Sequence, residues 1–233
     1  VIAWLFAPLV DEVQPGLGNL RYLVGFLFAV VLYGSVLLHE LSHAFVARRM
    51  GFGIASITLH FLGGATQVKG EAKTPRQEFW IAVVGPITSL AVGFAALGVW
   101  WVLPDGLVRA LVQALAAANL LVGITNLLPA LPLDGGRVLK AGVWQATGNV
   151  HRGTIVAAWG GRVLAVLVLL WPLFQSQVLQ VSASTTTWLL MVIMGGFLWT
   201  SSTAFLNHAR VRERLPRLVA RPLVRHTVFV DQS

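Results

Sequence analysis

Residues 22–47 read YLVGFLFAVVLYGSVLLHELSHAFVA, an apolar run that holds two histidines and a glutamate near its end. Because an α-helix rises about 1.5 Å per residue, this run is long enough to cross a hydrocarbon layer of about 30 Å. Placing such ionisable side chains in a membrane span costs roughly several kcal/mol, and proteins usually retain them there for a function. The run therefore predicts a membrane helix that carries a site.

The composition of the whole chain agrees with a membrane protein. Of its 233 residues, 56% are hydrophobic and 11% are charged, and the mean hydropathy is +0.75. Soluble domains carry about 25% charged residues, so a soluble enzyme and a disordered tail are excluded. The chain has no cysteine, which excludes a disulfide scaffold and leaves histidine and carboxylate as ligands for a transition metal.

The apolar runs predict a polytopic membrane protein of the all-α class, a bundle of about six transmembrane helices. The first is expected to be truncated, because it is about half as long as a span. Arg162 interrupts the fifth run. Residues 53–69 alternate apolar and polar side chains between glycines, which predicts a small membrane-associated β-sheet between the second and third helices. The expected helices are residues 1–10 (partial), 20–48, 78–103, 107–128, 154–174 and 185–207, with a short helix at 137–147.

The charges predict an orientation. If the second helix runs from outside to inside, every lysine and arginine except Arg21 and Arg109 lies on the inner side. The positive-inside rule then explains the net charge of +8, and no nucleic-acid partner is expected. We expect residues 1–207 to be the transmembrane core. Residues 208–233 are expected to be a basic cytoplasmic tail that leads to a C-terminal domain absent from this chain.

The sequence His39-Glu40-Leu41-Ser42-His43 has the spacing of a zinc site. Residues four apart share one face of a helix, so both imidazoles can bind one ion, and Glu40 beside them can act as the general base. The alternative is a structural polar cluster that serves helix packing.

Two histidines leave such a site short of a third protein ligand, because catalytic zinc usually has about three. Asp134 lies in the stretch NLLPALPLDGGR at residues 126–137. Pro129 and Pro132 break the fourth helix, and the two glycines after Asp134 permit a tight turn, so the carboxylate can enter a site at membrane depth. The alternative role for Asp134 is to cap the following helix.

Several motifs together resemble the site-2 protease family of intramembrane zinc metalloproteases, most closely the prokaryotic six-helix branch that often carries C-terminal CBS domains. They cover about residues 20–207. The motifs are His39–His43, Arg48–Gly51, Phe61–Ala65, Glu78–Pro86 and Asn126–Arg137.

The resemblance implies roles for individual residues. One Zn²⁺ per chain would be held by His39, His43 and Asp134, with Glu40 as the catalytic base. Asn126 would help to place or polarise the scissile carbonyl, and its alternative role is an interhelical hydrogen bond.

The resemblance also implies a function and a place. The activity would be hydrolysis of a peptide bond within or near the transmembrane segment of a membrane-anchored protein, in regulated intramembrane proteolysis. The substrate would be a single-pass protein such as an anti-sigma factor or a membrane-tethered regulator. The enzyme would be a multi-pass protein of the prokaryotic plasma membrane with its site towards the cytoplasm. Two alternatives remain: a metal transporter, and a catalytically silent relative that acts as a membrane scaffold.

Overall fold

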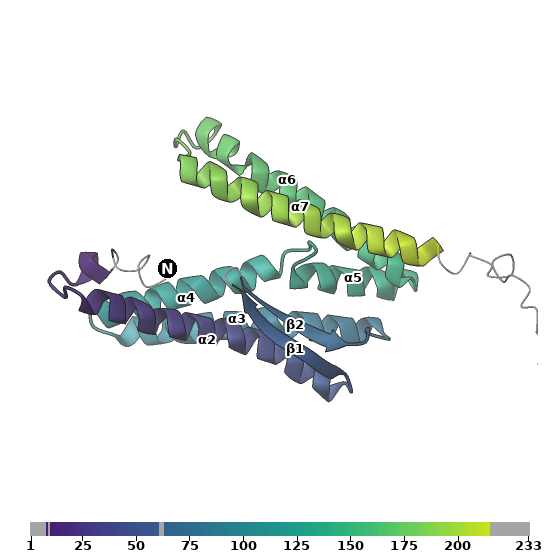
Figure 1. Ribbon diagram of the computed structural model, residues 1–233, viewed down its shortest axis with the longest axis horizontal. Coiled ribbons are helices and arrows are strands. Elements are labelled where there is room, and N and C mark those ends of the chain that lie inside the picture. Colours follow the sequence, from purple (N-terminus) through teal and green to yellow (C-terminus); the bar gives the residue numbers. More distant parts are fainter. Residues whose placement is uncertain (1–7, 9, 61–62, 215–233) are drawn as a thin grey trace, which may run out of the picture.

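The computed structural model describes residues 8, 10–60 and 63–214, and these are mostly helical (Figure 1). The predicted partial helix at residues 1–10 lies largely outside the described residues, as does most of the predicted tail. The elements in chain order are α2 (Leu20–Arg49), β1 (Gly53–His60), β2 (Gly63–Lys69), α3 (Pro75–Val102), α4 (Leu107–Asn126), α5 (Asp134–Thr147), α6 (Val150–Gln177) and α7 (Thr185–Arg214).

Among the described residues, five helices are long and apolar enough to cross a membrane: α2, α3, α4, α6 and α7 as far as Val211. Many of their large apolar side chains are exposed, as expected where lipid rather than water is the solvent. The predicted class, a helical membrane protein with a small sheet, is confirmed.

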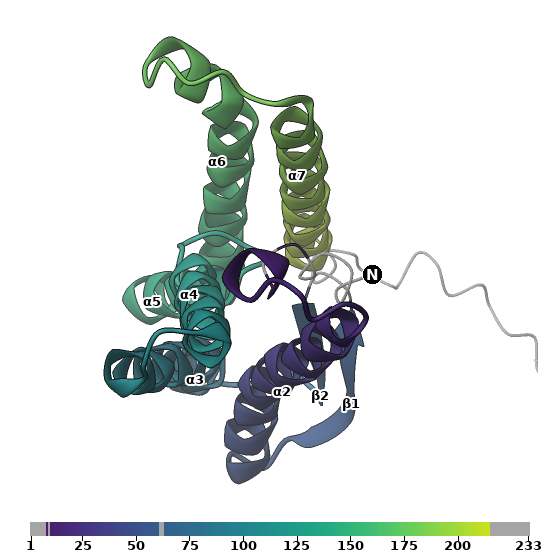
Figure 2. The same cartoon turned by 90° about the vertical axis from the view of Figure 1, so that its left-hand side faces the viewer.

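The helices form two groups (Figures 1 and 2). α3 packs between α2 and α4, while α6 and α7 form a hairpin that diverges from the other spans. The amphipathic helix α5 packs against both α3 and α6, so it joins the groups. This arrangement matters for the site because α2, α3 and α5 each supply part of it.

The predicted β-segment is a two-stranded antiparallel hairpin. β1 and β2 pair from Gly53 opposite Lys69 to His60 opposite Gly63, with an irregularity between Ile54 and Ser56. The hairpin packs against α2 and, in Figure 1, lies beside the later part of that helix.

The break between α4 and α5 brings the backbone back on itself. A Cβ on Gly135 would lie 2.3 Å from the Leu127 carbonyl, and one on Gly136 would lie 2.3 Å from the Leu131 nitrogen, so only glycine fits at either position. The Leu131–Pro132 peptide bond is cis.

Helix α5 begins at Asp134, three residues before the predicted start. Leu133 is the N-cap residue, and no side chain caps this helix. Asp134 is therefore not the N-cap, which corrects that alternative. Its carboxylate does not cap the helix and faces His39 and His43 instead.

Candidate metal centre

Helix α2 brings the two histidines together. His39 and His43 lie one turn apart, each 5% exposed, and their Nε2 atoms are 3.2 Å apart. Their rings meet edge to face, with centroids 4.8 Å apart. These two buried imidazoles, with their Nε2 atoms close together, supply two of the ligands of a metal-binding set.

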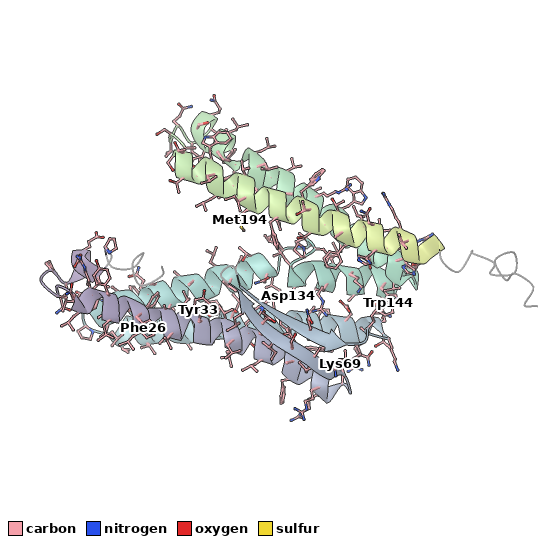
Figure 3. The ribbon with its side chains drawn as sticks, viewed as in Figure 1. Phe26, Tyr33, Lys69, Asp134, Trp144 and Met194 are labelled. Atoms are coloured by element: carbon pink, nitrogen blue, oxygen red, sulfur yellow. The ribbon has the colours of Figure 1, made fainter. Side chains whose placement is uncertain are left out.

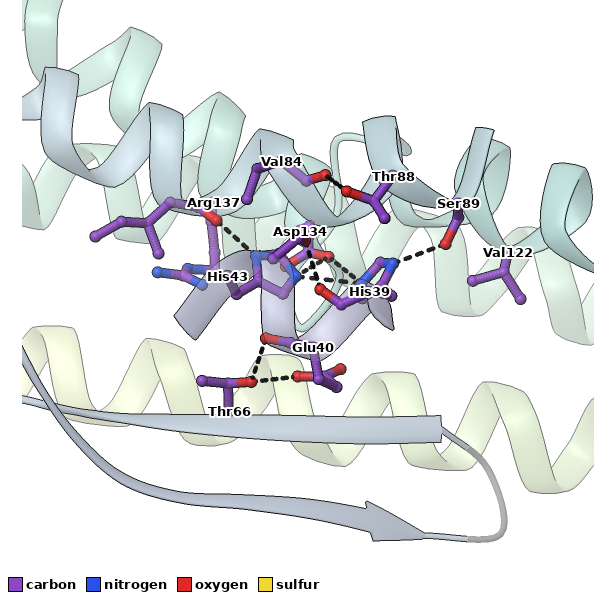
Figure 4. Close-up of polar contacts among 12 residues, drawn as sticks. His39, Glu40, His43, Thr66, Val84, Thr88, Ser89, Val122, Asp134 and Arg137 are labelled. Atoms are coloured by element: carbon purple, nitrogen blue, oxygen red, sulfur yellow. Dashed lines mark hydrogen bonds and ion pairs between the residues drawn. The ribbon is translucent and has the colours of Figure 1, made fainter. Parts of the chain in front are cut away.

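Asp134 completes the set from the start of α5 (Figures 3 and 4). Its Oδ2 lies 3.2 Å from the Nε2 of His39 and 3.2 Å from the Nε2 of His43. Burial alone would raise the pKa of Asp134. The contacts of its carboxylate with the two histidines lower the pKa by more than burial raises it, so the pKa lies below its ordinary value. Asp134 is thus held as the carboxylate, the form that binds metal.

The donor set fits zinc. The three ligand atoms all lie within 4.8 Å of one another. A tetrahedral zinc with ligand bonds of about 2.0–2.1 Å separates its ligand atoms by about 3.3 Å, close to the distances observed here. Two imidazoles and one carboxylate also leave a fourth position for substrate or water, as catalytic zinc sites do.

Helix α3 orients both imidazoles through their other ring nitrogens. His39 Nδ1 lies 2.9 Å from Ser89 Oγ. His43 Nδ1 lies 2.6 Å from the carbonyl oxygen of Ile81, which can only accept, so the hydrogen of His43 is on Nδ1 and its Nε2 is free to bind metal. Gly85 gives the rings room: a Cβ there would lie 2.2 Å from His43 Nε2.

Glu40 points away from α3 and meets the hairpin (Figure 4). Its side chain is buried, and Thr66 Oγ1 on β2 lies 2.7 Å from Glu40 Oε2 and 3.1 Å from the Glu40 carbonyl oxygen. Gly64 on the same strand passes so close that a Cβ would lie 2.3 Å from Glu40 Cγ. The hairpin therefore fixes the position of the Glu40 carboxylate, one residue after His39 on α2.

A buried ion pair joins α3 to α5. Glu78, 5% exposed, accepts from Arg137 Nε at 3.0 Å and lies 3.4 Å from Lys140 Nζ. Arg137 is one turn after Asp134, so the pair anchors the helix that presents the third ligand. The sequence alone does not identify this partner of Glu78, because Arg137 lies 59 residues further along the chain.

Asn126 is the last residue of α4 and is half-buried. Among the described residues, its side chain has no hydrogen-bonding partner, so the alternative role as an interhelical hydrogen bond is not seen there. Its amide remains available to another molecule.

Known proteins are similar to this chain in sequence and in fold. The model of peptidase family M50 matches residues 27–105 and 102–170. Rip3 of Mycobacterium tuberculosis is 43% identical over 178 residues, which cover 72% of this chain and 45% of Rip3. A zinc metalloprotease of Methanocaldococcus jannaschii is 34% identical over 157 residues, 66% of this chain and 45% of that protein.

A solved structure, the site-2 protease from Methanocaldococcus jannaschii, superimposes with a TM-score of 0.58 and 26% identity. The match covers 88% of this chain and 86% of that one. The chain spans about half the length of the curated relatives it matches. From the family match, these identities and the shared fold, we conclude that the chain belongs to peptidase family M50.

Proposed function

We propose that this chain is a zinc-dependent intramembrane endopeptidase that cleaves membrane-anchored proteins within or near their transmembrane segment. The observation that carries this function is the convergence of His39, His43 and Asp134, with Glu40 next to His39 in the sequence, in a chain whose described residues include five candidate spans. Membership of a peptidase family supports the same reaction.

Each residue of the site has its own role in the proposed peptide hydrolysis. His39, His43 and Asp134 hold the zinc, and Ser89 and Ile81 orient the two imidazoles. When bound, zinc supplies a Lewis acid that polarises the peptide carbonyl and lowers the pKa of water towards neutrality.

Glu40 is the general base. Its carboxylate takes a proton from the attacking water as the water oxygen bonds to the carbonyl carbon, and gives that proton to the leaving nitrogen as the C–N bond breaks. Thr66 orients the carboxylate through Oε2. We assign to Asn126, whose amide has no partner among the described residues, the donation of a hydrogen bond to the substrate backbone near the scissile bond.

We further propose that the substrate is a single-pass protein, such as an anti-sigma factor or a membrane-tethered regulator, and that cleavage belongs to regulated intramembrane proteolysis. A transmembrane helix hides its carbonyls in hydrogen bonds, so the substrate must unwind locally before Glu40 and the metal can act on it. We place the protein in a prokaryotic plasma membrane, and the distribution of basic residues supports a site that lies towards the cytoplasm.

The test is metal content and cleavage measured together on the purified wild type, Glu40→Gln and Glu12→Gln, with a model transmembrane substrate and with or without chelator. Glu12 is an exposed acid before α2 and serves as the control. We expect about one zinc in all three proteins. Cleavage is expected in the wild type and in Glu12→Gln, and chelator should abolish it.

Three outcomes would contradict the proposal. If the wild type binds no zinc, zinc-dependent peptide hydrolysis is excluded. Zinc in all three proteins without cleavage of any transmembrane substrate would favour a silent scaffold, and chelator-sensitive zinc uptake into vesicles would favour a metal transporter.

A further inference from the structure

Arg162 is a cation within a membrane-spanning helix, and its contacts among the described residues do not include the metal-binding set. It lies 12 residues after Val150, the start of α6, or about 18 Å along the helix. Its side chain is half-buried. A charge at such a position is costly unless it is paired, so it raises the question of which anion it meets.

The contacts of Arg162 leave most of its hydrogen-bonding capacity unused. Its Nη2 donates to Thr203 Oγ1 on α7 at 3.2 Å, and its guanidinium carbon lies 5.0 Å from the ring centroids of both Trp159 and Trp199. Its Nε is buried and has no acceptor among the described residues. A guanidinium carries several N–H donors, so one acceptor does not satisfy it.

No described carboxylate compensates the charge. Within the part of the chain that the structure describes, the ion pairs of Asp11, Glu78, Asp105 and Asp134 are all made with residues other than Arg162. The nearest termini of the two helices add exposed Arg152 and Arg210 instead. Arg162 thus has no counter-charge among the described residues, and an anion from outside them can pair with it.

We propose that the α6–α7 hairpin binds the headgroup phosphate of an anionic phospholipid at Arg162. The planar guanidinium matches phosphate oxygens with two parallel donors. Trp159 and Trp199 are 49% and 42% exposed and flank it, as indole rings do where acyl chains meet headgroups. Basic pockets between membrane helices are the usual sites for such lipids.

The bound lipid sits beside the loop that presents Asp134. Thr203 follows Ser202, whose Oγ donates to the Leu131 carbonyl oxygen at 2.8 Å, three residues before Asp134. A headgroup bound at Arg162 lies below the level of the other headgroups, so the bilayer is thinner next to the hairpin. The thinning is at about the depth of the loop that presents Asp134. The site is separate from the metal centre, and its existence does not depend on the proposed peptidase activity.

The experiment compares lipid binding by the wild type, Arg162→Gln and Arg162→Lys after the full chain has been stripped of lipid in a neutral detergent. Arg152→Gln is the matched control, because it removes the same charge from an exposed position of the same helix. Native mass spectrometry and thermal unfolding are followed with added phosphatidylglycerol, phosphatidylcholine or inorganic phosphate. Zinc content checks that each variant is folded.

We expect the wild type and Arg152→Gln to bind one phosphatidylglycerol in preference to phosphatidylcholine, and to be stabilised by it. Arg162→Gln should lose that preference by about tenfold or more, since charge-assisted hydrogen bonds are lost. Arg162→Lys should keep part of it because it keeps the charge, and this variant decides the matter if Arg162→Gln does not fold.

Equal binding of the two lipids by the wild type would overturn the proposal, as would a preference that survives in both Arg162 variants. Stabilisation by inorganic phosphate as strong as that by phosphatidylglycerol would also overturn it, because the site would then select a free anion rather than a lipid.

Discussion

Arg137 donates from Nε to Oε1 of Glu78 at 3.0 Å, which ties the first turn of α5 to the first turn of α3. Helix α3 carries the groups that orient both histidines, and α5 carries Asp134. The ion pair therefore sets the position of the third ligand relative to the other two, although neither Glu78 nor Arg137 belongs to the metal-binding set.

Glu78→Gln should destabilise the protein and weaken zinc binding. The change leaves Arg137 and Lys140 without their buried counter-charge. Losing such a pair, with one partner buried and the other partly exposed, lowers the free energy of unfolding by about 2–4 kcal/mol. Unfolding midpoints and zinc affinity measured by chelator competition test this. Asp105→Asn is the control, because Asp105 pairs with Arg109 but is 96% exposed, and it should change neither quantity appreciably. Equal behaviour of the two variants would show that the Glu78 pair has no positioning role.

Thr66→Val should lower kcat by about tenfold while zinc content stays at the wild-type level. Valine has the shape of threonine but cannot donate to Glu40 Oε2, so the proposed general base loses its orientation. Thr66→Ser keeps the hydroxyl and should restore most of the rate. A loss of rate shared by Thr66→Ser would point to packing of the hairpin rather than to the hydrogen bond.

Gly85→Ala should abolish zinc binding. The added methyl group would lie 2.2 Å from His43 Nε2 and 2.7 Å from His39 Nε2, where the ion has to bind. Gly98→Ala on the same helix is the control, since a Cβ there meets nothing within 4 Å. Metal analysis of the purified variants decides the question, and a Gly85→Ala protein with a full complement of zinc would disprove this packing argument.

Ser89→Ala should weaken zinc binding by about 10–100-fold, because groups that orient a metal-binding histidine have effects of this size. Among the described residues, its neighbour Thr88 bonds only to the Val84 carbonyl of its own helix, so Thr88→Val is a control that should leave affinity unchanged. Both affinities can be measured by competition with a chromophoric chelator. An unchanged affinity in Ser89→Ala would mean that packing alone holds His39.

The sequence predicted the parts of this molecule that depend on local pattern. Apolar runs indicated the spans, and the spacing of His39 and His43 indicated a shared helix face, because both follow from helix geometry. Asp134 was expected from chemistry, as the acid brought to membrane depth by a broken helix. The structure brings it within 3.2 Å of both imidazoles.

The contacts that depend on packing between distant elements could not be predicted. Ser89, Thr66 and Glu78 are ordinary polar residues in sequence, and their roles appear only when α3, β2 and α5 are set against α2. Helix ends were also hard to place. α7 continues to Arg214, beyond the expected end at 207, because a helix satisfies its own backbone and arginines near its C-terminus favour its dipole.

The contact between Ser202 and Leu131 has a consequence for biosynthesis. The two histidines leave the ribosome early, whereas the loop before Asp134 gains its hydrogen bond from Ser202 and its neighbours Gly160 and Gly161 only after the last two helices have been made. A nascent chain that has inserted only its first spans therefore has ligands but lacks the support for a finished site. A chain interrupted before α7 therefore lacks the contact that supports the loop before Asp134.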